Sequence, residues 1–264
     1  MLAPMTAPTT RLTHIGGPTM LIEIDGWRLL TDPTFEAPGR RYAFGWGTHG
    51  TKVAGPSLGL AELGPIDAVL LTHDQHADNL DDAGRALLPS VGTVLTTVPA
   101  ARRLGGNAVG LEPWRTTTLE DGERPSLTVT ATPGRHGPPL TRSIVGDVTG
   151  FAVRRSGADE VAVWVSGDTV LFDGLREVAR RLTVDVAVLH LGAVQFGVTG
   201  PVRFTFSARE GAEMVDLLRP RVVVPVHYEG WSHFRQGRDV IEPALAGTDA
   251  EVRWLALGQP TEVG

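Results

Sequence analysis

Short runs of apolar, mostly β-branched residues alternate along the chain with stretches of helical periodicity. The apolar runs predict strands over residues 69–72, 91–97, 127–132, 161–166, 186–189 and 222–226. The periodic stretches predict helices over residues 81–88, 175–182 and 208–218. Strands that alternate with helices are typical of layered α/β folds, so this is the predicted fold class.

The chain opens with a predicted antiparallel hairpin. Residues 20–24 and 28–31 are predicted strands, joined across Asp25-Gly26, a dipeptide that favours a tight hairpin turn. Further along, Ser207 is placed to cap the last predicted helix, with Glu210 as its capping-box partner.

Two longer stretches, residues 35–56 and 196–206, contain Gly and Pro and have no clear periodicity. Connections of this length in a compact domain are usually functional or disordered. A disordered linker would be poor in aromatic residues. These stretches contain Tyr42, Phe44, Trp46, Phe196 and Phe204. We therefore expect loops that pack near a pocket.

The composition fits one large domain. The chain has 264 residues, of which 42% are hydrophobic and 20% charged, enough to bury a sizeable core. Residues 1–10 are rich in Pro and Thr and form a candidate disordered N-terminus, which leaves residues 11–264 as the predicted domain. Neither a secretory signal pattern nor a run of about 18 apolar residues occurs. We expect a cytoplasmic protein without membrane insertion.

Charge and cysteine content narrow the function. With 24 basic and 30 acidic residues the formal net charge is −6, and no Lys/Arg block or basic stripe is present. A nucleic acid is therefore not an expected partner, and a small-molecule substrate is expected instead. The absence of cysteine excludes disulfides, thiolate zinc sites and cysteine nucleophiles, so any metal must be held by oxygen and nitrogen ligands.

Residues 70–81, Leu-Leu-Thr-His-Asp-Gln-His-Ala-Asp-Asn-Leu-Asp, place histidines and carboxylates directly after an apolar run. Both are ligand types for zinc and other divalent ions. Further ligand types follow other predicted strands, namely His136, Asp168 and His227. Alone, each is more commonly a loop or turn residue. Because side chains beyond the carboxyl ends of strands can meet at one sheet edge, their joint placement predicts a metal site.

The order of these residues resembles the metallo-β-lactamase superfamily. Its zinc motif reads His-x-His-x-Asp-His and is followed by a lone His, a bridging Asp after Gly, and a final His. His76-Ala77-Asp78 is similar to the middle of that motif, and His136, Gly167-Asp168 and His227 are similar to its later elements. The resemblance covers nearly the whole chain and implies a four-layer αββα sandwich with the metals at one edge.

The beginning of the chain resembles one branch of that superfamily. Residues 13–23 and the stretch Leu30-Thr31-Asp32-Pro33 are similar to the branch that contains ascorbate-6-phosphate lactonase and N-acyl-phosphatidylethanolamine phospholipase D. The resemblance implies that Asp32 is a buried carboxylate that orients a ligand histidine.

The chain departs from the motif at two places. Two residues separate His73 from His76 where the superfamily usually has one, and Asn79 stands where it usually has His. The first ligand position is therefore filled either by His73 or, in an alternative register, by Asp74. The amide oxygen of Asn79 suits a harder ion better than zinc, which leaves manganese, iron and a single-metal site open.

With His73 in the first position, the resemblance implies two sets of ligands. One ion, expected to be zinc, is held by His73, His76 and His136. The other is held by Asp78, Asp168 and His227, with Asp168 bridging the two ions.

Such a site predicts a metal-dependent hydrolase. A divalent ion with an open coordination position lowers the pKa of its water to about 7 and so supplies a metal-bound hydroxide. We expect it to cleave an ester-type bond, with Asp78 orienting the water or collecting its proton and Asp168 holding the ions. A lactone fits the lactonase-like beginning of the chain, and a phosphodiester fits the same metals equally well. Candidates to bind a phosphate are Arg135, Arg142, Arg203 and Arg235.

Two other classes of protein remain open. A di-iron oxidoreductase on the same fold would normally need an electron-carrying partner domain, for which the chain has no room. A non-catalytic binding protein results if Asn79 and the insertion before His76 abolish metal binding. His49 and His233, in loops with Gly and Trp, are candidates to face the substrate. Neither the oligomeric state nor the physiological substrate is indicated.

Overall fold

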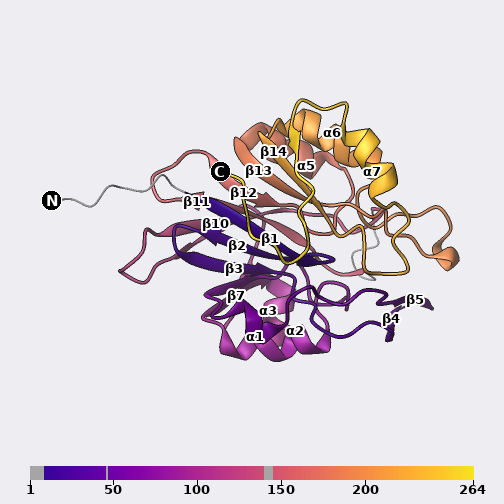
Figure 1. Cartoon of the computed structure of the whole chain (residues 1–264), viewed down its shortest axis with the longest axis horizontal. Helices are drawn as coiled ribbons and strands as arrows, with labels where there is room; N and C mark the ends of the chain where they lie inside the picture. The colour runs from indigo at the N-terminus through magenta and orange to yellow at the C-terminus, as the bar shows by residue number, and fades with distance from the viewer. Residues whose placement is uncertain (1–8, 46, 140–144) are drawn as a thin grey trace.

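The computed structural model describes residues 9–45, 47–139 and 145–264, and arranges them as two stacked seven-stranded sheets (Figure 1). The first sheet has the order β16-β1-β2-β3-β6-β7-β8 and the second the order β15-β14-β13-β12-β11-β10-β9. Trp46, Arg142 and most of the candidate disordered N-terminus lie outside the described residues.

The strands of the first sheet are β1 (Thr10–Gly16), β2 (Thr19–Ile24), β3 (Trp27–Thr31), β6 (Ala68–Leu70), β7 (Thr93–Thr97), β8 (Ala108–Leu111) and β16 (Thr261–Glu262). Those of the second are β9 (Thr116–Leu119), β10 (Leu127–Pro133), β11 (Thr149–Arg155), β12 (Val161–Val165), β13 (Val184–His190), β14 (Val222–Val226) and β15 (Glu251–Val252). A separate pair consists of β4 (Arg41–Gly45) and β5 (Thr48–Thr51).

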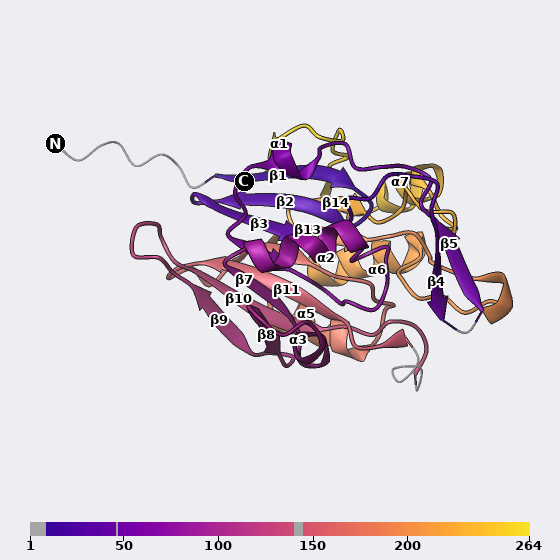
Figure 2. The same cartoon turned by 90° about the horizontal axis from the view of Figure 1, so that it is seen from below.

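Helices cover the outer face of each sheet (Figures 1 and 2). They are α1 (Leu60–Leu63), α2 (Asp82–Leu87) and α3 (Val98–Leu104) on the first sheet, and α5 (Asp173–Arg181), α6 (Ala208–Leu218) and α7 (Arg238–Leu245) on the second. Short 3₁₀ turns occur at η1 (Leu88–Ser90) and η2 (Gly197–Thr199). This arrangement confirms the predicted four-layer αββα sandwich.

Apolar side chains fill the three spaces between these layers. Phe151 and Ile22 are fully buried between the two sheets. Trp164 packs between the second sheet and its helices, and Leu30 between the first sheet and its helices. Strands such as β12 and β14 are continuous apolar runs because both faces of each are covered.

The local turn and cap predictions are confirmed. β2 and β3 pair antiparallel across Asp25 and Gly26, whose φ angles of 49° and 87° suit a tight hairpin turn. Ser207 caps α6 by accepting from the Glu210 amide, and the Glu210 carboxylate accepts from the Ser207 amide (3.3 and 3.0 Å). These features depend only on residues close in sequence.

The stretch 35–56 differs from its prediction because it contains the β4–β5 hairpin. Its antiparallel pairing is bulged near Gly45, and the Thr51 amide donates to Ser232 Oγ (2.9 Å). The strands lack the regular apolar alternation that would reveal them in the sequence. They are held in place by contacts with the distant C-terminal loop. In Figure 2 the hairpin lies at one end of the sandwich, beside the orange loop that contains η2.

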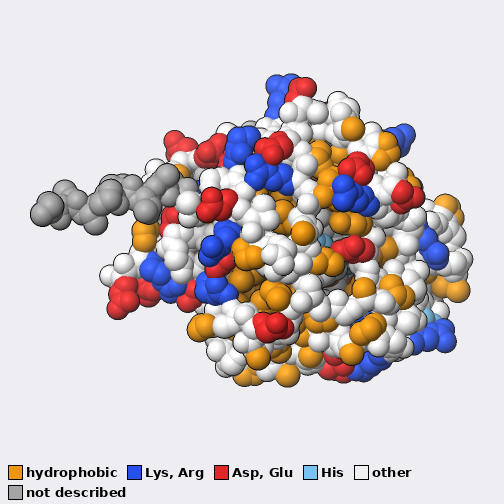
Figure 3. All heavy atoms as spheres, in the orientation of Figure 1, with side chains coloured by type: hydrophobic (Ala, Val, Ile, Leu, Met, Phe, Trp, Pro, Cys, Tyr) orange, Lys and Arg blue, Asp and Glu red, His pale blue; other side chains and the backbone are white. Residues whose placement is uncertain are grey.

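On the face of the molecule seen in Figure 3, basic and acidic side chains are interspersed with apolar ones. Among the helices of the described residues, none is both long and apolar enough to cross a membrane.

Candidate metal centre

The predicted ligands lie in loops at one edge of the sandwich. His73, His76 and Asp78 follow β6, and the remaining three follow the carboxyl ends of β10, β12 and β14, namely His136, Asp168 and His227. All six are buried. These strands run in the same direction within their sheets, so the loops that follow them converge.

His73, His76 and His136 form the first group. His76 Nδ1 lies 3.1 Å from His73 Nε2 and 3.0 Å from His136 Nε2. One nitrogen from each ring falls within 4.8 Å of the others, a spacing suited to one ion. The loop after β6 therefore accommodates the extra residue before His76 without removing His73 from the group.

Hydrogen bonds orient two of these imidazoles. His136 Nδ1 donates to the carbonyl of Phe204 (2.7 Å), which leaves Nε2 with its lone pair. The Thr72 hydroxyl donates to Asp32 (2.8 Å) and therefore accepts from His73 Nδ1 (3.1 Å). Burial lowers the pKa of His136 to about 3 and that of His73 well below its ordinary value. Both rings are thus neutral and able to bind a metal near pH 7.

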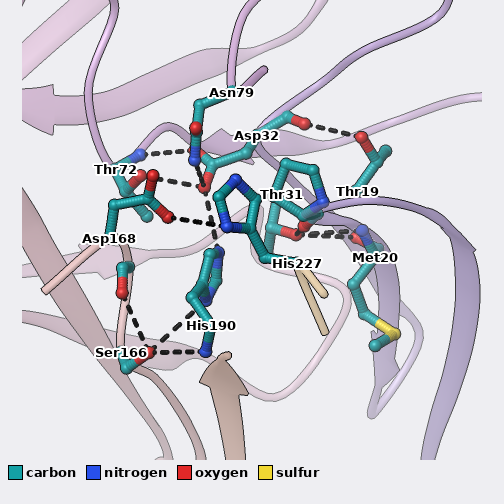
Figure 4. A network of polar contacts seen from close by, with 12 residues as sticks. Thr19, Met20, Thr31, Asp32, Thr72, Asn79, Ser166, Asp168, His190 and His227 are labelled. Carbon is teal, nitrogen blue, oxygen red and sulfur yellow. Dashed lines mark hydrogen bonds and ion pairs between the residues drawn. The ribbon is translucent and has the colours of Figure 1, made fainter. Parts of the chain in front are cut away.

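Asp78, Asp168 and His227 form the second group, again with one donor atom of each within 4.8 Å of the others. His227 Nδ1 lies 3.4 Å from Asp168 Oδ1, and Nε2 lies 3.6 Å from Asp78 Oδ2. Figure 4 shows His227 and Asp168 side by side. The backbone of His227 has a φ of 56°, a strained conformation that its amide holds by donating to Gly17 (2.9 Å).

This donor set fits a divalent cation. Asp78 Oδ1, Asp168 Oδ1 and both ring nitrogens of His227 are buried and make no hydrogen bond to the described chain. Buried polar atoms without partners cost about 1–3 kcal/mol each, so such a cluster needs an explanation. Burial, with the charges of Asp78 and Asp32, raises the pKa of Asp168 well above its ordinary value. A cation would offset both penalties.

His233 contacts the second group from the C-terminal loop. Its Nε2 lies 2.8 Å from Asp78 Oδ2. The ring stacks on Phe196 with centroids 5.2 Å apart and lies 4.8 Å from the ring of Phe44. Burial alone would raise the pKa of Asp78, but its contacts with His227 and His233 hold that pKa well below its ordinary value. His233 therefore supports an ionised Asp78.

Asp32 and Asn79 lie close to Asp168 and His227 (Figure 4). The Asp32 carboxylate accepts from the Thr72 amide (2.7 Å) and from Asn79 Nδ2 (3.1 Å). Its link to His73 runs through the Thr72 hydroxyl. Asn79 Oδ1 is buried without a hydrogen-bond partner among the described residues. Asp32 is thus a buried carboxylate that is linked to His73 through Thr72.

Ser166 and His190 belong to this network, although neither is among the residues that the sequence predicts for the site. The His190 amide donates to Ser166 Oγ (3.0 Å), and His190 Nε2 lies 3.4 Å from Asp32 Oδ2. The His190 ring lies 5.4 Å from that of His227. The available signal was that His190 ends a buried apolar strand and Ser166 directly follows another, at the edge where the ligands lie.

The structure does not bring Asp74 or His49 into the site. The Asp74 carboxylate pairs with Arg103, whose Nε donates to it (3.0 Å), so the alternative register with Asp74 as first ligand gains no support. His49 is exposed on β5, with Nδ1 3.0 Å from the carbonyl of Gly47.

An αββα sandwich with histidines and aspartates at the carboxyl ends of its strands defines the class of metallo-β-lactamase-fold proteins. A family model described as a beta-lactamase superfamily domain matches residues 27–228. The chain therefore belongs to the metallo-β-lactamase superfamily.

The chain is similar to proteins that are named as metal-dependent hydrolases. The chain is 28% identical to a UPF0173 metal-dependent hydrolase of Caldivirga maquilingensis over 85% of each protein. It is 27% identical to one of Deinococcus radiodurans over 96% of this chain and 99% of the relative. Among solved structures, an isothiocyanate hydrolase from Delia radicum gut bacteria matches with a TM-score of 0.77 and 23% identity, over 95% of this chain and 98% of that one.

Proposed function

We propose that the protein is a metal-dependent hydrolase that binds one or two divalent ions, zinc foremost, through the two buried groups. The observation that carries this proposal is the pairing of two three-residue donor groups at one sheet edge, each with its donor atoms within 4.8 Å. Superfamily membership and relatives named as metal-dependent hydrolases support it.

A bound divalent ion would supply a water of lowered pKa and polarise the bond to be cleaved. His73, His76 and His136 would hold one ion through neutral imidazoles. Asp78, Asp168 and His227 would hold the second, and Asp168 would be shared between the two ions. Asp78, kept ionised by its histidine contacts, would orient the water or collect its proton at Oδ1.

The donor chemistry favours zinc at the first group and is less selective at the second. Three imidazoles suit zinc, whereas two carboxylates and one imidazole also suit manganese or iron. The bond cleaved would be of the ester type, either in a lactone, as in the lactonase-like branch, or in a phosphodiester.

Metal analysis by mass spectrometry of freshly purified protein tests the proposal. We expect stoichiometric metal in the wild type, and loss of metal and of hydrolysis in Asp168→Ala. The matched control is Asp159→Ala, which changes an exposed aspartate. If the wild-type protein contained no bound metal, the proposed hydrolase function would be wrong. Two bound irons with redox activity would instead favour the oxidoreductase. Undiminished turnover in Asp168→Ala would remove this residue from the mechanism.

A further inference from the structure

A hollow opens directly above the candidate metal centre. Its floor includes His76, Asp78 and His136. Its walls are Phe44, Gly45 and Thr48 from the β4–β5 hairpin, Val145, and Val194, Phe196, Thr199 and Phe204 from the loop after β13.

Three phenylalanine rings give the wall an apolar surface that extends as far as the histidines. The ring of Phe44 lies 5.6 Å from that of Phe196, which lies 5.9 Å from that of Phe204. Phe44 also contacts His76 edge-on (5.7 Å), and Phe204 contacts His136 in the same way (5.8 Å). A group bound at the metals would therefore have its neighbouring atoms against aromatic carbon.

The described arginines that the sequence predicts as phosphate ligands do not line this hollow. Arg135 lies over the ring of Phe172 (4.8 Å). Arg203 pairs with Glu210 (3.5 Å), and Arg235 Nε donates to the carbonyl of Gln195 (3.1 Å). Arg142 lies outside the described residues. Among the described residues that line the hollow, none is Lys or Arg.

We propose that the substrate is a small, uncharged ester or lactone whose apolar side chain packs against Phe44, Phe196 and Phe204. This inference rests on the proposed hydrolase function and selects among its substrates. An anionic phosphodiester would lose hydration in this wall without gaining a cation from the described residues, whereas an alkyl chain gains by leaving water.

The reaction balances without a further reactant. A water oxygen bonds to the carbonyl carbon, the acyl C–O bond breaks, and the leaving oxygen takes up a proton. A lactone and one water thus give one hydroxycarboxylic acid, with no change of oxidation state.

The proposed preference for an uncharged substrate with an apolar side chain is tested by measuring how fast the protein as purified hydrolyses matched probes. We expect kcat/KM for γ-decalactone to exceed that for γ-valerolactone at least tenfold, because about two buried methylenes already suffice for that factor. Bis(p-nitrophenyl) phosphate should be cleaved at least 100-fold less efficiently than γ-decalactone. Equal or faster cleavage of the phosphodiester would overturn this inference and leave the hydrolase function standing.

Variants test whether the hollow is the part of the protein that discriminates between the two lactones. Phe196→Ala should raise KM for γ-decalactone about tenfold and lower the ratio of kcat/KM for γ-decalactone to that for γ-valerolactone, and Phe196→Leu should restore most of the loss. The control Phe172→Ala removes a ring outside the hollow and should change kcat/KM for neither lactone. If Phe196→Ala kept the wild-type ratio of kcat/KM values for the two lactones, the assignment of Phe196 to the substrate-binding wall would be wrong.

Binding provides a readout that does not depend on turnover. Calorimetry should show saturable binding of 5-hexyl-2-pyrrolidinone, the unhydrolysed lactam analogue, with a negative heat-capacity change and about tenfold weaker affinity in Phe196→Ala. Dimethyl phosphate should not bind. If the lactam binds in this way but no probe is hydrolysed, the hydrolase function fails and the pocket assignment stands; if the lactam does not bind, the pocket assignment fails.

Discussion

At the scale of single residues, the position after Asp78 is the main departure from the superfamily motif. Asn79 replaces an imidazole there, and its amide donates to Asp32. An imidazole nevertheless reaches Asp78, because His233 comes from the C-terminal loop to 2.8 Å from Oδ2. With Oδ2 occupied, Oδ1 is the carboxylate oxygen left for a metal or a water. His233 thus acts on the site through Asp78.

Replacing His233 by Phe keeps a ring in the aromatic stack but removes its hydrogen bond to Asp78. We expect affinity for the second ion to fall 10–100-fold, as is typical when a group that orients a ligand is lost. Titration with zinc, followed by calorimetry, measures this. The first ion should bind as before, and His233→Gln, which retains an N–H donor, should recover part of the loss. His49→Phe, at an exposed position, serves as the control, and equal second-ion affinity in both Phe variants would contradict the role.

At the scale of elements, Asp81 joins three segments. Its carboxylate caps α2 by accepting from the Gly84 amide (2.8 Å) and accepts from the Glu36 amide (2.7 Å). It also pairs with Lys52 Nζ at 2.9 Å, and both side chains are almost completely buried. A buried pair is costly to break because one charge is left without a partner. This pair fixes the stretch after β5 against the start of α2.

Lys52→Met should therefore lower the free energy of unfolding by about 3–5 kcal/mol. Urea denaturation measures this. In the double variant, Asp81→Asn also removes the carboxylate charge that is left without a partner and should recover part of the lost stability. The effects of the two substitutions are therefore not additive. A single variant as stable as the wild type would show that the pair contributes little.

Gly84 lies where α2 packs against the chain after β3. A Cβ at this position would lie 1.9 Å from the carbonyl oxygen of Pro33. Helix propensity alone would favour Gly84→Ala by about 1 kcal/mol, but the overlap with backbone dominates. We expect a net loss of about 1–3 kcal/mol. The control is Gly247→Ala, which meets nothing within 4 Å and should be neutral or stabilising. A stabilised Gly84→Ala would contradict the packing.

At the scale of the whole molecule, the candidate centre connects the two sheets. His73, His76 and Asp78 follow a strand of the first sheet, whereas His136, Asp168 and His227 follow strands of the second. A ligand that binds only the folded chain stabilises it by mass action. Bound metal would thus add to the apolar contacts that hold the sheets together.

Removal of metal should lower the melting temperature. At free metal about 1,000 times Kd the stabilisation is about 4 kcal/mol, which corresponds to a fall of about 8–16 °C on chelation for a chain of this size. Scanning calorimetry with and without a chelator measures it. Asp168→Ala should show a much smaller shift, and an equal shift in both proteins would place the stabilising metal elsewhere.

The sequence by itself determined the layered fold, the β2–β3 turn, the α6 cap and the order of ligand types after the strands. These features depend on periodicity and on side-chain chemistry within a few residues. The tertiary structure decided which partners those residues find. It placed Asp74 against Arg103, brought His233 to Asp78, and set the hairpin and its phenylalanine over the histidines. Such contacts join residues far apart along the chain, and they form only when loops of both sheets pack at one edge.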